Sequence, residues 1–160
     1  MSKISPCLWF NGAAEDAANF YVSLLPDSRI LRVQRNVGDG PGGKAGTVLI
    51  IEFTLAGQTF LALNGGTEFP HSHAISFSID CTTQAEVDRL WAALGDGGEP
   101  VQCGWIKDRF GVSWQIVPSV LPKLLADPDP AKAARAMAAM MSMVKLDIAA
   151  LEAAHRGDPA

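Results

Sequence analysis

The sequence contains few cysteines and no long hydrophobic run. Its three cysteines, Cys7, Cys81 and Cys103, are odd in number and far apart, so they do not form a disulfide framework. We expect buried thiols in a reducing cytoplasm. No apolar run approaches the ~20 residues that a membrane-spanning helix needs. The first ten residues have neither an apolar core nor a cleavage site, so we expect no signal peptide.

Charge is also sparse, because only 19% of the residues are charged and the net charge is −4. No cluster of basic residues is present, so we expect no nucleic-acid partner and no attachment to a membrane surface. Hydrophobic residues make up 48% of the 160 positions, which is enough for a real core. This length suits one compact domain or two tightly packed half-domains.

Two stretches of the chain share one pattern, offset by roughly 70 residues. Each begins with a short apolar strand, at residues 4–10 and 74–80. A helix follows each strand, and its apolar side chains recur at the spacing of one buried helix face. Those side chains are Ala17, Phe20, Tyr21, Leu24 and Leu25 in the first copy, and Val87, Leu90, Trp91 and Leu94 in the second. The repeat therefore predicts a duplicated α+β module.

Further strands complete each copy. Alternating or β-branched segments predict strands at residues 28–37, 47–55, 59–63, 101–107 and 112–117. Residues 38–46 contain five glycines and predict a mobile loop. Thr83 and Glu86 form a capping box at the start of the second helix.

The pattern changes after Pro118. Asp129 and Pro130 are typical of a helix start, and one helix is predicted from about residue 131 to 154. Its apolar stripe consists of Met137, Met140, Met141, Val144, Ile148 and Leu151. This stripe has no partner within its own copy, so it either crosses the domain or contacts a second subunit. We expect the second arrangement, in a homodimer.

Five segments resemble the PhnB-like branch of the vicinal-oxygen-chelate superfamily, which includes glyoxalase I and the bleomycin-binding proteins. They are FYVSLLPDSRI (20–30), FLALNGG (60–66), EVDRLWAAL (86–94), CGWIKDRFGVSWQIVP (103–118) and KLDIAALEAA (145–154). The resemblance implies an α+β fold of two βαβββ modules, 1–66 and 67–118, forming a cleft-bearing mixed sheet with helices on its outer face. A C-terminal helical extension, 119–160, follows. Members of this branch often carry the name 3-demethylubiquinone-9 3-methyltransferase.

The metal site of the superfamily does not carry over. Its four ligand positions fall at Pro6, Ala62, Ala74 and Gln115, and only Gln115 has a donor atom. A catalytic metal needs three or more protein ligands. A shift in strand register would offer Asn64 and His73 instead, but a one-residue shift turns a side chain to the other face of the sheet. We therefore expect no metal and no cofactor.

The resemblance places a set of side chains on the concave face of the sheets, where a small molecule would bind. They are Leu8, Asn64, His73, Ser76, Ser78, Trp105, Ser113 and Gln115. No catalytic residue can be named from the sequence. His71 and His73 are either exposed loop imidazoles or a general base at the cleft mouth. Glu52 is either a buried base or an exposed side chain.

Two functions remain open. One is a metal-independent enzyme acting on a small substrate, and the other is a protein that sequesters a small molecule. An enzyme should have a strongly perturbed titratable group in its pocket, whereas a sequestering protein should offer an apolar or aromatic slot without one. The sequence does not support the methyltransferase name. A glycine-rich turn that binds a cofactor lies between a strand and a helix, whereas residues 38–46 lie between two predicted strands.

Overall fold

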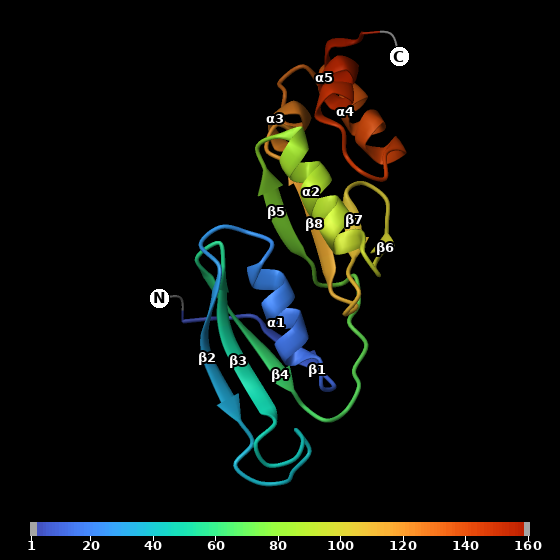
Figure 1. Ribbon diagram of the computed structural model, residues 1–160. Helices are drawn as coiled ribbons and strands as arrows, with labels where there is room; N and C mark the ends of the chain where they lie inside the picture. The colour runs from blue at the N-terminus through green and yellow to red at the C-terminus, as the bar shows by residue number, and fades with distance from the viewer. Residues whose placement is uncertain (1–2, 159–160) are drawn as a thin grey trace. The chain divides into compact units, whose positions relative to one another are not determined.

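The computed structural model describes residues 3–158 and divides into two compact units, Met1–Pro70 and His71–Ala160 (Figure 1). Each unit contains a four-stranded mixed sheet and a helix that packs on one face of that sheet. The predicted α+β fold of two βαβββ modules is therefore confirmed.

The first unit follows the order strand, helix and three strands. Its elements are β1 (Cys7–Phe10), α1 (Ala14–Val22), β2 (Arg29–Arg35), β3 (Val48–Leu55) and β4 (Gln58–Asn64). The strand order in the sheet is β1-β4-β3-β2. The first strand pairs in parallel with the last strand of the module, and the other pairings are antiparallel.

The second unit repeats this order and then adds three helices. Its elements are β5 (Phe77–Cys81), α2 (Gln84–Gly95), β6 (Glu99–Pro100), β7 (Trp105–Lys107), β8 (Ser113–Pro118), α3 (Leu121–Leu125), α4 (Pro130–Ser142) and α5 (Ile148–Arg156). The strand order is β5-β8-β7-β6, with β5 and β8 parallel. Topology therefore confirms the duplication that the helix and strand patterns predicted.

Helix α1 covers one face of the first sheet, as Figure 1 shows. Tyr21 of α1 is buried and stacks on Phe53 of β3, with ring centroids 6.4 Å apart. Phe53 stacks in turn on Phe60 of β4. Side chains that alternate along a strand point to opposite faces, so this aromatic column fixes which residues face the helix.

Helix α2 covers the second sheet in the same way. Leu90 and Leu94 are fully buried, as is Ile106 of β7. The predicted capping box is present, since the Glu86 backbone N–H donates to Thr83 Oγ1. Two side chains expected on the buried helix faces, Phe20 and Trp91, are only half-buried, so that part of the expectation was wrong.

The C-terminal segment forms three helices where one was predicted. Helix α4 ends at Ser142 and α5 starts after Asp147, whose side chain accepts from the Ala150 backbone N–H. Between them, Gln84 of α2 donates to the Leu146 carbonyl and accepts from the Ile148 N–H. In a continuous helix, the Leu146 carbonyl and the Ile148 N–H would bond to other backbone groups of the same helix. Their bonds to Gln84 therefore go together with the interruption of the helix.

The predicted apolar stripe is divided by this break. Leu151 and Leu146 are buried with Leu121 in a small core of the second unit's helices. Met137 and Met141 of α4 remain exposed, as does Val144 in the connection to α5. Part of the stripe therefore packs within one chain, which corrects the expectation that it lacks an intramolecular partner.

The three cysteines differ in exposure. Cys81 is buried, Cys103 is half-buried and Cys7 is exposed, so the expectation of buried thiols holds in full only for Cys81 and was wrong for Cys7. Burial, and then the Glu86 carboxylate, raise the pKa of the Cys81 thiol to about 12. Cys81 is therefore an inert thiol at neutral pH. None of the helices within residues 3–158 has the length and apolar character needed to cross a membrane.

Candidate functional site

The sequence placed Leu8 and Asn64 on the concave face, but in the first unit both lie on the helix-covered face. Leu8 pairs with Ala62 across the β1–β4 ladder, and both side chains are buried. The reason is the alternation of β1, which buries Leu8 and Phe10 beneath the helix and directs Cys7 and Trp9 to the other face. Leu8 is therefore a core residue.

Asn64 is buried, and both ends of its side-chain amide make hydrogen bonds within the first unit. Its Oδ1 accepts from the Ala14 backbone N–H at 3.0 Å, and its Nδ2 donates to the Val48 carbonyl at 3.0 Å. The first of these bonds caps α1, because the residue at the N-cap, Ala13, has no side-chain oxygen. Asn64 thus joins α1 to the sheet.

The other six predicted residues belong to the second unit, where strand register brings three of them side by side. Gln115 of β8 pairs with Ser78 of β5 on one side and with Trp105 of β7 on the other. Neighbours in register share one face of a sheet. Phe77 and Trp114 occupy the opposite face, beneath α2. Ser78, Gln115 and Trp105 therefore form a row on the face opposite α2, which we call the open face of the second sheet.

His73 joins this face through Ser113. His73 Nδ1 lies 3.0 Å from Ser113 Oγ, and the imidazole ring meets the Trp105 ring edge-on with centroids 6.4 Å apart. Ser113 is buried, whereas His73 is exposed. A hydroxyl held at hydrogen-bond distance from an imidazole is the arrangement that proton transfer requires.

Two further polar contacts lie on or beside the open face. Gln115 Nε2 donates to Ser76 Oγ at 2.9 Å, and this bond orients the Gln115 amide. Lys107 and Glu99 form an ion pair on β7 and β6. The hydrogen bond from Lys107 and then its charge lower the pKa of the Glu99 carboxyl, with a smaller contribution from His73. The sequence analysis missed this ion pair, although the antiparallel β6–β7 register creates it.

The donor set does not fit a superfamily metal. Within residues 3–158, no group of three or more His, Cys, Asp or Glu side chains could hold a metal ion. Of the four expected ligand positions, Ala62 lies beneath α1 and Gln115 already donates to Ser76. Glu52 forms an ion pair with Arg32 at 3.5 Å and is half-buried, so its carboxylate is a paired surface group.

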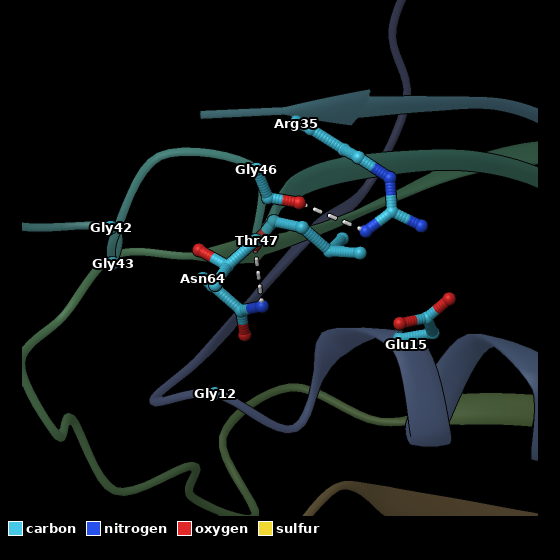
Figure 2. A pocket seen from close by; sticks show the side chains of 9 residues that line it. Gly12, Glu15, Arg35, Gly42, Gly43, Gly46, Thr47 and Asn64 are labelled. Atoms are coloured by element: carbon cyan, nitrogen blue, oxygen red, sulfur yellow. Dashed lines mark hydrogen bonds between the residues drawn. The ribbon is translucent and has the colours of Figure 1, made fainter. Parts of the chain in front are cut away.

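A separate cavity of about 490 Å³ lies in the first unit. It is lined by Gly12, Glu15, Arg35, Gly42, Gly43, Gly46, Thr47, Val48 and Asn64. Figure 2 shows Arg35, from β2, and Glu15, from α1, on the same side of this cavity, where Arg35 donates to the Gly46 carbonyl at 3.1 Å. Sequence reasoning missed this cavity, and the one local signal for it is an arginine, Arg35, shortly before a glycine-rich loop.

The glycine-rich loop that walls this cavity has internal hydrogen bonds. The Gly40 and Gly43 backbones bond to each other, and Asn36 Nδ2 donates to the Gly42 carbonyl. Asp39 Oδ1 accepts from the Ala45 N–H. The loop connects β2 to β3 with no helix after it, so it lacks the strand–turn–helix geometry that binds a nucleotide-type cofactor.

Residues 2–117 match the family described as 3-demethylubiquinone-9 3-methyltransferase. The chain belongs to this family. Its PhnB-like character, which the five sequence segments indicated, is confirmed by a solved PhnB protein from Bacillus cereus. That protein is 34% identical, with a TM-score of 0.68 over 73% of this chain and 99% of the other.

Two more solved structures extend the comparison. Protein PA1353 from Pseudomonas aeruginosa is 23% identical and shares the fold, with a TM-score of 0.60 over 74% of this chain and 98% of that one. A glyoxalase/bleomycin resistance protein from Albidiferax ferrireducens T118 is 17% identical, with a TM-score of 0.45 over 71% of this chain and 96% of that one. No curated protein matches the chain.

Proposed function

We propose that this PhnB-like protein binds a small polar or aromatic molecule on the open face of the second sheet. The observation that carries the proposal is the contact between His73 Nδ1 and Ser113 Oγ, at 3.0 Å, beside the Trp105 ring. Trp105 offers an aromatic surface, and the Gln115 amide offers a hydrogen bond that fixes orientation. Pockets for small molecules combine these two kinds of group.

We further propose that the protein is a metal-independent enzyme in which His73 acts as the general base. His73 would take the Ser113 hydroxyl proton, or a substrate proton placed within reach of the same nitrogen. The Lys107–Glu99 ion pair supplies opposite charges beside the imidazole. These groups bind, orient and move a proton without a Lewis acid.

The alternative is a non-catalytic protein that sequesters its ligand, as the bleomycin-binding relatives do. The observation that favours it is the edge-on contact of the His73 and Trp105 rings, which offers a ligand an aromatic surface. Both functions use the same face, so they differ in whether the ligand is altered.

A thermal-shift screen of a metabolite set tests the binding proposal. A ligand at 100 times its Kd should stabilise the protein by roughly 2.7 kcal/mol. The shift should shrink in Gln115→Ala and Trp105→Phe and persist in Gln58→Ala, an exposed control in the first unit. A full shift in both open-face variants would overturn the proposed site.

Mass spectrometry of each binding compound after incubation then separates the two functions. An enzyme converts the compound, and His73→Gln or Ser113→Ala should abolish conversion while leaving much of the binding. Recovery of the intact compound at every time point would instead support sequestration.

We also propose a cytoplasmic homodimer. Its support in the structure is β2, the edge strand of the first sheet, which exposes the apolar side chains Leu31 and Val33. An edge strand carries unpaired backbone groups and readily pairs with another chain. The free thiols of Cys7, Cys81 and Cys103 favour a reducing compartment.

A further inference from the structure

Two sulfur atoms from distant parts of the sequence meet on the surface of the second unit. Cys103 Sγ lies 3.7 Å from Met141 Sδ. Backbone bonds fix the two segments together, because the Cys103 N–H donates to the Met143 carbonyl at 2.9 Å and the Gly104 N–H donates to the Val144 carbonyl at 2.7 Å. The thiol and the thioether are therefore held side by side.

A third sulfur lies one helical turn away. Met137 precedes Met141 by four residues on α4, and residues at this spacing are neighbours on a helix surface. Met137 and Met141 are 44% and 60% exposed. Met140 and Met143, by contrast, pack against the buried leucines of the C-terminal helices. The exposed pair thus contributes little to the core.

We propose that Cys103, Met141 and Met137 form a binding site for a soft monovalent metal ion, copper(I). Thiolate and thioether sulfurs select this ion over harder ones. A metal about 2.3 Å from each sulfur, the usual metal–thiolate length, would subtend about 107° at the observed sulfur separation. That angle is within a few degrees of the tetrahedral value, so the two sulfurs need little movement.

Binding replaces a proton without any change of oxidation state. The Cys103 S–H bond breaks, the sulfur–copper bond forms, and the proton passes to solvent. The thioethers of Met141 and Met137 each donate a lone pair. No oxidant or reductant takes part in this step.

Zinc fits this cluster poorly, since it prefers four Cys, His or carboxylate ligands. No such group of three exists within residues 3–158. Contact between two copies is also a weaker explanation of the exposed methionines. Stable interfaces bury about 800 Å² on each partner, far more than Met137, Met141 and Val144 provide. The copper proposal is independent of the ligand proposed for the open face.

The test is an anaerobic titration of the full chain with copper(I) in competition with the chromophoric chelator bicinchoninate. The wild type should bind one equivalent, and Cys103→Ser should abolish binding. Met141→Leu keeps the size of the side chain and removes its sulfur, so it should weaken binding by at least tenfold. Met137→Leu should weaken it several-fold.

Matched variants guard against an adventitious thiol or a folding defect. Cys7→Ser removes an exposed thiol of the first unit, and Met140→Leu removes a packed thioether. Both should bind as the wild type does. Cys103→Gly should fold at least as well as the wild type, because Cys103 has a φ of 60°, and should still lose the metal. Wild-type affinity in Met141→Leu, or equal loss in Cys7→Ser, would overturn the proposal.

Discussion

Asp108 Oδ2 accepts a hydrogen bond from Trp114 Nε1 at 2.8 Å, and each residue is only 2% exposed. Asp108 Oδ1 accepts from the backbone N–H groups of Phe110 and Val112, at 2.8 and 3.0 Å. One buried carboxylate therefore closes the turn between β7 and β8 and fixes the indole beneath α2.

We predict that Asp108→Ala destabilises the protein by about 3 kcal/mol, because it leaves the buried indole N–H and two backbone N–H groups without this acceptor. Denaturant unfolding followed by tryptophan fluorescence measures the change. Arg109→Ala is the matched control, since its ion pair with Asp96 is exposed and should contribute less than about 1 kcal/mol. Similar losses in the two variants would contradict this role for Asp108.

Leu90→Ala and Leu94→Ala should each reduce the free energy of unfolding by about 2–5 kcal/mol, the usual cost of deleting a fully buried leucine. Chemical denaturation checks this. Arg89→Ala, an exposed change on the same helix, should cost about 0.5 kcal/mol or less. A change of less than about 1 kcal/mol at both leucines would show that this face of α2 is not in the core.

The fold was predictable because its signals are local. The apolar spacing of α1 and α2 and the capping box at Thr83 each reflect a few neighbouring residues. The break between α4 and α5 was not predictable, because it depends on Gln84, more than 60 residues away in the sequence. The apolar spacing continues across the break and therefore indicated one helix.

Folding lowers the pKa of the Asp127 carboxyl below its ordinary value of 3.8. The main cause is the hydrogen bond from the Asp129 backbone N–H, at 2.8 Å, and His155 Nε2 adds a contact at 2.9 Å. A lowered carboxyl pKa stabilises the native state above the ordinary value, and this contribution is lost as pH falls through the folded value. Attachment of α5 should therefore weaken below about pH 4.

Hydrogen exchange of the α5 amides, compared between pH 5 and pH 3, measures this effect. Asp127→Asn should reduce the difference in exchange between the two pH values, while Asp16→Asn, an exposed change in the first unit, should leave it intact. Asp88 and Glu99 also have lowered pKa values, so the variant should retain part of the acid sensitivity. An unchanged profile in Asp127→Asn would refute the assignment.

Light scattering tests the homodimer. Val33→Lys places a charge on the exposed edge strand β2 and should convert the dimer to a monomer, because charged side chains block edge pairing. Val37→Lys, beyond the end of β2, is the matched control and should leave the dimer intact. A wild-type monomer would rule out the homodimer, and a dimeric Val33→Lys would place the contact elsewhere.

The candidate site was predictable only in part. The placement of Gln115 opposite the helix-covered face follows from alternation along β8, since one strand fixes the parity of its own residues. Leu8 and Asn64 were assigned from the family alignment, and the structure shows β1 and β4 in the opposite parity. Which of the two sheet faces a helix covers depends on packing across the whole sheet. The sequence of one short strand such as β1 does not determine that face.

Each module closes its sheet by pairing its first strand in parallel with its last, β1 with β4 and β5 with β8. During synthesis, β1 therefore has no paired strand until β4 has been made, and the first sheet is complete only once Asn64 has left the ribosome. Asn64 also caps α1, so the final residue of the module also secures this helix. A nascent chain ending shortly before this residue would lack both the closing strand and the cap, and would expose the apolar face of α1 to chaperones.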